Sequence, residues 1–303
     1  MEPYHLEYEH PENLVETEWL EKNVNNPKIR IFDCSVFVVK NENTEQAHRI
    51  PFTFKNARAY YEKSHIPNAN FINILNELTD NTHPIPLMLP SEEKIIDVLG
   101  TLGINDDTHV ILYSTTEPNW ATRVWWILHS LGFDNVAVLN GGWSKWVKEN
   151  RPTSTQEHLY ESCQFTPRPR KETLVSKEDV LAATEDNGAH IVSALPSPIY
   201  NGISDITFGR KGRIRKSLNI PFTALHDPDT GCYLPANQLE KVFNQLGANR
   251  ADRIISYCGG GVAASNEAFA LHLMGYENLA VYDGSMFEWG NDDTLPMECA
   301  NGN

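Results

Sequence analysis

The stretch Arg253-Ile-Ile-Ser-Tyr257-Cys258-Gly-Gly-Gly261-Val262-Ala-Ala264 decides the fold of the chain. It begins with a short apolar run rich in isoleucine, which is typical of a buried strand, and passes through three glycines into the apolar run of a helix. A strand that leads through a glycine-rich loop into a helix is the start of an α/β unit. We therefore predict an α/β fold in which mainly parallel strands are flanked by helices.

The first half of the chain repeats this order of elements. His109-Val-Ile-Leu-Tyr-Ser114 predicts a strand, Ala121 to Gly132 a helix, and Val136-Ala-Val-Leu139 the next strand. After the glycine loop, the helix Ala263 to Gly275 and the strand Leu279-Ala-Val-Tyr282 follow in the same sequence. Self-similarity of this kind indicates two copies of one supersecondary plan.

A chain of 303 residues accommodates two domains of ordinary size. We predict a first domain over residues 1–150 and a second over residues 173–303. Residues 151–172 are rich in proline and polar residues and lack periodicity, so they are expected to form a linker.

Charge and cysteine content narrow the class of protein further. The formal net charge of −15 argues against nucleic acid or anionic membranes as general partners. The start of the chain lacks the features of a secretory signal, and no apolar run is long enough to span a membrane. The five cysteines are scattered and form no C-x-x-C pair, which favours free thiols in a reducing, cytoplasmic setting over disulfides or a zinc site.

Cys258 has the most reactive side chain in this loop. It lies at the carboxyl end of a predicted strand, where ligands bind in open α/β sheets. Glycines at 259–261 allow positive φ angles, so successive N–H groups can form an anion nest, and the following helix adds its positive end. These features predict a nucleophilic thiolate with a pKa below the ordinary value.

At this loop the chain resembles the tandem-domain rhodaneses, the family of thiosulfate and 3-mercaptopyruvate sulfurtransferases. Cys258-Gly-Gly-Gly-Val-Ala263 is similar to the six-residue active loop of that family. The other matching stretches are His65-Ile-Pro67, Met88-Leu-Pro90, Thr122-Arg-Val-Trp-Trp126, Asn140-Gly-Gly-Trp143, Asn219-Ile-Pro-Phe222 and Asp283-Gly-Ser285 with Glu288-Trp289.

The resemblance implies two tandem rhodanese-like domains, a non-catalytic first and a catalytic second. It implies that Cys258 takes a sulfane sulfur from a small anionic donor as a persulfide and passes it to a thiol or thioredoxin-type acceptor, in a monomer without metal or cofactor. The residues implied to hold the substrate are Gly259, Gly260, Gly261, Val262 and Ala263. Ser114 occupies the corresponding position in the first half, where no glycine nest follows.

The chain also departs from the family at positions that bear on the donor. Gly260 stands where the mercaptopyruvate enzymes have a serine, and no arginine occurs in the stretch from Ser193 to Tyr200. The basic run Arg210 to Lys216 offers replacements. We hypothesise that Arg210 or Arg213 binds the anionic end of the donor, the alternative being a solvated basic loop. Asp283 is expected to orient the active loop by accepting backbone N–H bonds.

Two alternative functions stay open. A cysteine-dependent phosphatase would need an arginine that closes the loop, where Ala264 stands. A non-catalytic sulfur carrier or interaction module is the stronger alternative, because the loop serine and the family arginine are both missing.

Overall fold

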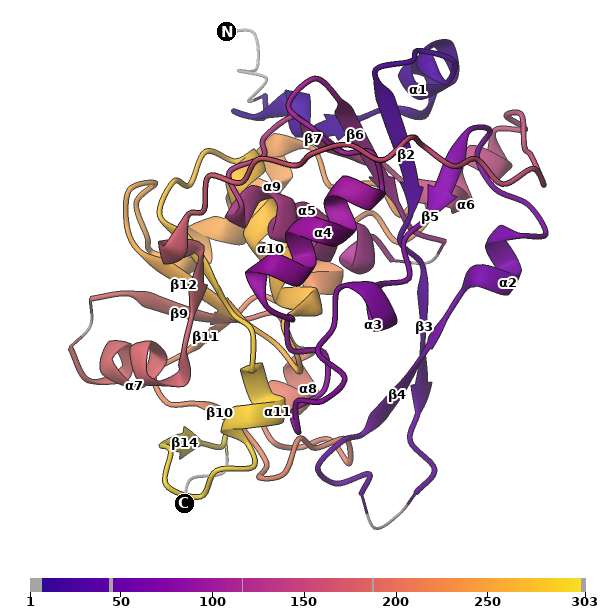
Figure 1. The fold of residues 1–303 in the computed structure, drawn as a ribbon. Coiled ribbons are helices and arrows are strands. Elements are labelled where there is room, and N and C mark those ends of the chain that lie inside the picture. Colours follow the sequence, from indigo (N-terminus) through magenta and orange to yellow (C-terminus); the bar gives the residue numbers. More distant parts are fainter. Residues whose placement is uncertain (1–6, 44–45, 116, 187, 301–303) are drawn as a thin grey trace, which may run out of the picture.

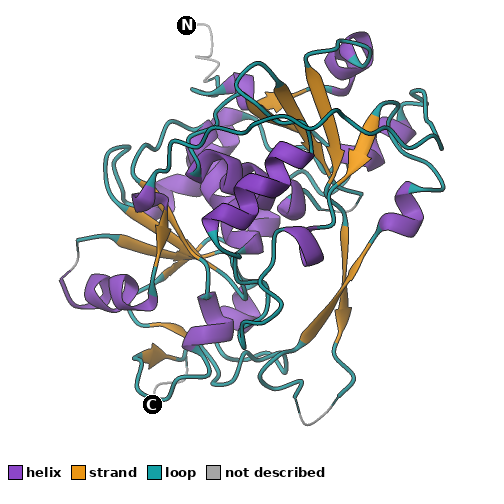
Figure 2. Cartoon of the chain, in the orientation of Figure 1, coloured by secondary structure: helices purple, strands orange, loops and turns teal. Residues whose placement is uncertain are grey.

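The computed structural model describes residues 7–43, 46–115, 117–186 and 188–300. Each half of the chain builds one five-stranded sheet whose paired strands all run parallel, and the two sheets lie on opposite sides of a central group of helices (Figure 1, Figure 2). The predicted tandem α/β architecture is therefore confirmed.

The first half runs from the amino-terminal strand to the helix before the linker. Its elements are the short 3-10 helix η1 (Pro11–Asn13), β1 (Leu14–Val15), α1 (Thr17–Asn23), β2 (Ile29–Asp33), β3 (Val36–Lys40), β4 (Phe52–Asn56), α2 (Arg58–Tyr61), β5 (Ala69–Phe71), α3 (Ile74–Glu77), α4 (Glu92–Thr101), β6 (His109–Tyr113), α5 (Asn119–Ser130), β7 (Val136–Leu139) and α6 (Gly142–Lys148).

The second half follows a similar plan. Its elements are η2 (Lys171–Thr173), β8 (Leu174–Val175), α7 (Lys177–Asp186), β9 (His190–Ser193), α8 (Ser197–Tyr200), β10 (Arg213–Ile214), β11 (Leu218–Asn219), η3 (Phe222–Leu225), α9 (Ala236–Phe243), η4 (Asn244–Leu246), β12 (Ile254–Tyr257), α10 (Val262–Leu273), β13 (Leu279–Tyr282), α11 (Ser285–Trp289) and β14 (Met297–Glu298).

The two sheets share one topology. The strand order is β1-β7-β6-β2-β5 in the first sheet and β8-β13-β12-β9-β11 in the second. In each sheet the first strand of the half, β1 or β8, pairs with β7 or β13. The repeat seen in the sequence is therefore also a repeat of strand order. The strands β6 and β12 occupy equivalent central places, which confirms that Ser114 and Cys258 follow equivalent strands.

The helices α5 and α10 hold the two halves together. They pack against each other, and the ring of Trp125 meets that of Phe269 edge-on at 4.8 Å between centroids. Residues on every side of α10 are buried, including Ser265, Asn266 and Glu267, so this helix has no solvent-facing stripe. One continuous apolar core therefore includes both halves.

The linker is ordered along the first half. The N–H of Cys163 donates to the carbonyl of Gly100 at 2.9 Å, the N–H of Arg168 donates to that of Leu131 at 2.7 Å, and Phe165 is buried. Figure 1 shows this segment crossing the molecule from the first half to the second. The linker is thus held against the first half by backbone hydrogen bonds and a buried side chain.

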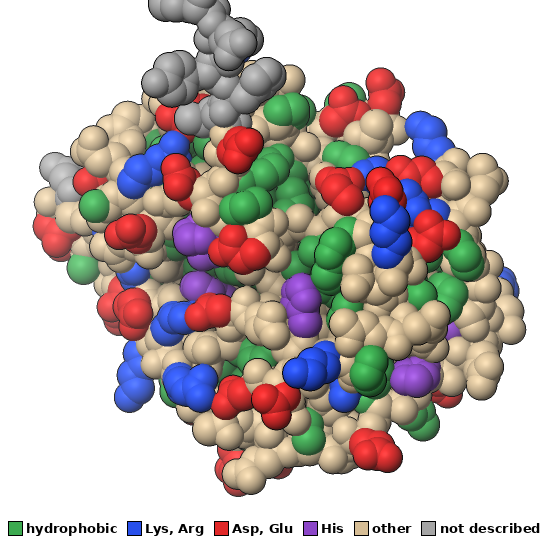
Figure 3. Space-filling view, turned by 90° about the horizontal axis from the view of Figure 1, so that it is seen from above, with side chains coloured by type: hydrophobic (Ala, Val, Ile, Leu, Met, Phe, Trp, Pro, Cys, Tyr) green, Lys and Arg blue, Asp and Glu red, His purple; other side chains and the backbone are tan. Residues whose placement is uncertain are grey.

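Acidic side chains are spread over the surface. On the face shown in Figure 3, Lys and Arg side chains lie among Asp and Glu side chains. Among the described residues, no helix is long and apolar enough to cross a membrane.

Candidate active site

Cys258 directly follows the central strand β12, and α10 begins four residues later. The N–H groups of Met286 and Phe287, in the first turn of α11, donate to the carbonyls of Cys258 and Gly259 at 3.0 and 2.8 Å. The Ser285 hydroxyl accepts the N–H groups of Cys258 and Gly261 at 3.0 and 3.2 Å. The start of α11 therefore fixes both ends of the active loop.

Each glycine of the loop has its own structural reason. Only Gly261 is in the left-handed region, with φ at +75°, so the expectation of a loop curled by positive φ at all three glycines is wrong for Gly259 and Gly260. A Cβ on Gly259 would lie 2.6 Å from the ring of Phe208, and one on Gly260 would lie 2.6 Å from the ring of Phe287. In this arrangement a side chain at either glycine would require the neighbouring aromatic ring to shift.

The Cys258 thiol is almost fully buried, with 3% of the residue exposed. Burial raises the pKa of this thiol, while hydrogen bonds from the N–H groups of Ala264, Gly260 and Ala263, together with the charge of Arg123, lower it. Burial has the larger effect, so the expected net lowering of the pKa is wrong. The backbone N–H groups of Gly260, Ala263 and Ala264 nevertheless lie close enough to the sulfur to favour its anionic form.

Cys258 borders a cavity of about 360 Å³ between the two halves of the chain. Most of its lining is apolar, and Gly259, Gly260, Val262 and Ala263 of the active loop take part. The remaining lining residues are Val38, Phe52, Phe54, Leu87, Glu117, Asn119, Trp120, Leu195, Pro196, Ile199, Ile206, Phe208, Phe222 and Phe287. Gly261 lies behind the loop and does not line the cavity.

One wall of this cavity comes from the hairpin β3–β4 of the first half. Figure 1 shows the place of this hairpin in the fold. The two strands pair antiparallel from Val36 to Asn56, and Val38, Phe52 and Phe54 line the cavity. Next to the hairpin, the carbonyl of His48 accepts the N–H of Gly209 at 2.6 Å. The half that lacks Cys258 therefore supplies one wall of the site.

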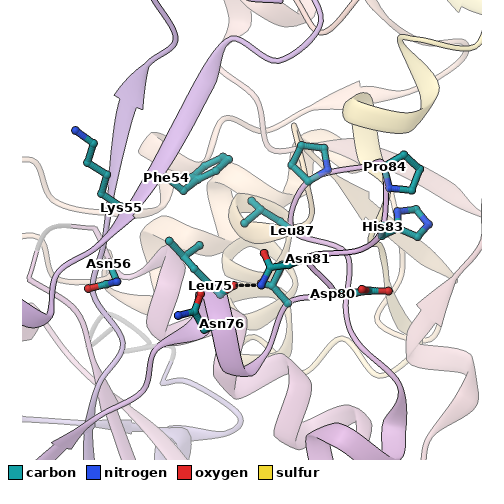
Figure 4. Close-up of a pocket in the computed structure, with 12 residues that line it drawn as sticks. Phe54, Lys55, Asn56, Leu75, Asn76, Asp80, Asn81, His83, Pro84 and Leu87 are labelled. Carbon is teal, nitrogen blue, oxygen red and sulfur yellow. Dashed lines mark hydrogen bonds between the residues drawn. The ribbon is translucent and has the colours of Figure 1, made fainter.

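A second, more polar cavity of about 650 Å³ lies on the first half (Figure 4). Phe54 and Leu87 line both cavities and thus stand between them. Leu87 has φ at +65°, an unfavourable conformation for a residue with a Cβ. Its carbonyl accepts a bond from Nη2 of Arg123 at 3.1 Å, which helps hold this conformation.

Beneath the active loop lies a buried ion pair between the two halves. Nη2 of Arg123, on α5, is 2.5 Å from Oδ1 of Asp283, and only 2% of the arginine side chain is exposed. Oδ2 of Asp283 accepts the N–H of Leu89 at 3.0 Å. Asp283 therefore binds the first half rather than the N–H groups of the active loop, which corrects the role expected for it. A Cβ on Gly261 would lie within 2.8 Å of both partners.

The two arginines expected to bind the donor are engaged elsewhere. Arg210 donates to the carbonyls of Trp289 and Leu295, each at 2.8 Å, and so caps the region after α11. Arg213 lies 3.7 Å from the Glu298 carboxylate and stacks over the ring of Tyr200. Neither lines the Cys258 cavity, so the hypothesis that they bind the donor there is not supported.

Other candidate groups are structural or absent. His65 is fully buried, and its two ring nitrogens lie 2.6 and 3.0 Å from the carbonyls of Tyr61 and Gln156. The Ser114 hydroxyl donates to the carbonyl of Glu117 within its own loop. In the described ranges, no cluster of His, Cys, Asp and Glu could hold a metal ion.

Comparison with known proteins agrees with this architecture. Residues 16–149 and 176–292 each match the Rhodanese-like domain family. The chain is 32% identical to thiosulfate sulfurtransferase from Rattus norvegicus over 91% of each chain, and 31% identical to 3-mercaptopyruvate sulfurtransferase from Escherichia coli K12 over 94% of this chain and 97% of that protein. The crystal structure of the Escherichia coli 3-mercaptopyruvate sulfotransferase SseA superposes with a TM-score of 0.76 at 30% identity, covering 90% of this chain and 98% of that one. The chain therefore belongs to the tandem-domain rhodanese family and is a sulfurtransferase.

Proposed function

We propose that the enzyme carries sulfur as a persulfide on Cys258. The donor is 3-mercaptopyruvate or thiosulfate, and the acceptor is a thiophile such as cyanide, a small thiol or thioredoxin. The observation that carries the proposal is that Cys258 lines the cavity between the two halves, where the N–H groups of Gly260, Ala263 and Ala264 favour its anionic form.

The first half-reaction is a nucleophilic displacement. The Cys258 thiolate attacks the outer sulfur of the donor, a sulfur–sulfur bond forms, and the bond between that sulfur and the rest of the donor breaks. The leaving group is pyruvate, which takes up a proton at carbon, or sulfite. The loop N–H groups then hold the anionic terminal sulfur, as donors of an oxyanion hole hold oxygen.

The second half-reaction returns the enzyme to its starting state. The acceptor attacks the terminal sulfur and leaves with it, and Cys258 departs as a thiolate. Since donor and acceptor use the same cavity in turn, ping-pong kinetics are expected.

Between the two donors, the cavity favours 3-mercaptopyruvate. Glu117 is the charged side chain among the described residues that line the cavity, and no lysine or arginine accompanies it. A thiosulfate dianion therefore loses its hydration without gaining a cation, whereas the mercaptopyruvate anion carries a single charge.

Intact-mass measurement after treatment with either donor tests the proposal. We expect Cys258 to gain one sulfur that cyanide removes, and Cys258→Ser to gain none. Cys163→Ser is the matched control, because Cys163 lies in the linker segment and does not line the cavity. No added sulfur with either donor would favour the alternative of a non-catalytic sulfur carrier or interaction module. Monomeric state and cytoplasmic location remain predictions from the sequence.

A further inference from the structure

One nitrogen of the buried guanidinium behind the active loop has no partner. Arg123 lies on α5 of the first half, where its Nη2 pairs with Oδ1 of Asp283 at 2.5 Å and donates to the carbonyl of Leu87 at 3.1 Å. Its Nη1 is also buried but makes no hydrogen bond to any of the described residues. Buried polar atoms are nearly always hydrogen-bonded, so this nitrogen needs a physical reason.

The unpartnered nitrogen lies next to the backbone of the active loop. A Cβ on Gly261 would be 2.8 Å from Nη1 of Arg123 and 2.7 Å from Oδ1 of Asp283. Gly261 is the N-cap of α10 and follows Cys258 by three residues. The buried ion pair therefore stands against the loop itself, on the side away from the cavity, and Arg123 turns an unused donor toward it.

A positive charge at this place acts on the sulfur through a medium that screens it weakly, since Arg123 and Cys258 are both buried. The charge of Arg123 is among the causes that lower the pKa of the Cys258 thiol. Carboxyl groups on the elements around the loop, which disfavour a thiolate where they are ionised, are those of Glu117, Glu267, Asp283 and Glu288. The cation that opposes them comes from the first half.

We propose that Arg123 is a positioning residue of the sulfur-transfer reaction, whose charge is held behind the active loop by Asp283 and Leu87 and stabilises the anionic sulfur of Cys258. The inference rests on the proposed function, because it concerns the same nucleophile. One half of the chain then supplies the nucleophile, and the other half supplies the cation that stabilises its anion. The thiolate and the terminal sulfur of the persulfide both carry a single negative charge near this cation, so both states gain from it.

The test measures the pH profile of Cys258 alkylation by iodoacetamide, a neutral reagent, with each cysteine followed by peptide mass spectrometry. The midpoint of the profile reports ionisation of the thiol, and the plateau at high pH reports access to it. We expect Arg123→Met to raise the midpoint, so that the thiolate fraction at pH 7 falls about tenfold. Asp283→Asn should lower the midpoint, so that this fraction rises about threefold. Arg123→Lys keeps the charge and should keep the wild-type midpoint.

Opposite shifts separate an effect of charge from an effect of structure, because either substitution breaks the same ion pair. Midpoints that move in the same direction, or that do not move, overturn the inference. If Arg123→Met does not fold, the sign of the shift in Asp283→Asn decides.

Arg30→Met is the matched control. The charge of Arg30 lowers the pKa of Cys163, so this variant should shift the profile of Cys163 and leave that of Cys258 unchanged. An equal shift at Cys258 would mean that the overall charge sets its ionisation, and would overturn the inference. Sulfur loading of the wild-type enzyme separates the two proposals: loading with unshifted profiles overturns the role of Arg123 alone, and shifted profiles without loading overturn the proposed function alone.

Discussion

Replacing Ser285 by alanine removes one hydroxyl that holds the active loop in place. That hydroxyl accepts the N–H groups of Cys258 and Gly261 and donates to the carbonyl of Tyr282 at 2.7 Å. Ser285 is fully buried. The alanine variant therefore leaves two buried N–H groups without an acceptor, and each unsatisfied donor costs about 1–3 kcal/mol. We expect Ser285→Ala to lower the free energy of unfolding by about 2–6 kcal/mol and to slow sulfur transfer.

Ser265→Ala is the matched control for this prediction. Ser265 is also fully buried, and its hydroxyl donates to the carbonyl of Gly261 at 2.7 Å, but the backbone N–H of Ser265 donates to the same carbonyl at 3.1 Å. Since that acceptor stays satisfied, the cost should be about 1 kcal/mol or less.

Urea unfolding of both variants measures the difference in stability, and the rate of Cys258 alkylation reports the position of the loop. The reasoning is refuted if the two variants differ by less than about 0.5 kcal/mol, the usual scatter for uninvolved sites. A loop that alkylates at the wild-type rate in Ser285→Ala would also show that the hydroxyl does not position the sulfur.

Three further predictions concern residues around the loop. Leu87→Gly should be more stable than Leu87→Ala by about 1 kcal/mol in urea unfolding, the reverse of the usual order, because the position has φ at +65°; the usual order would contradict the strain. Burial raises the pKa of Glu267 from 4.5 to about 8, so the folded state favours its neutral form. The free energy of unfolding that this preference contributes is full below pH 4.5 and is lost as the pH rises to about 8. Glu267→Gln should flatten that fall in unfolding free energy, and an unchanged slope would reject the assignment. Arg123→Met and Asp283→Asn should each lower the free energy of unfolding by about 3–5 kcal/mol, because each leaves a buried charge unpaired. The double variant should lower it by clearly less than the sum of the two, and additive losses would show that the pair is not coupled.

The sequence predicts most of what depends on local pattern. The β-branched run before Cys258 and the apolar run after Val262 predict the strand and the helix that the structure contains, and the same is true around Ser114. The repeated order of these elements predicts the shared topology, because short parallel units leave few possible connections.

Contacts between distant segments leave no local signal in the sequence. Nothing local to Ser285 indicates that its hydroxyl accepts the N–H of Cys258, and nothing around Arg123 indicates its ion pair with Asp283. The basic run at Arg210 has the composition of an anion site, yet its side chain is engaged by carbonyls some 80 residues further along the chain. Composition gives the charge of a segment but not the partners that the fold brings to it.

The hairpin β3–β4 has a consequence for how recognition and chemistry are divided between the two halves. The nucleophile of the proposed cycle belongs to one copy of the repeat, while Val38, Phe52 and Phe54, which line its cavity, belong to the other. Substitutions in the hairpin are therefore expected to change which donors the enzyme accepts without changing the reacting residue. The copy without Cys258 would then act as a recognition element for a reaction that the other copy performs.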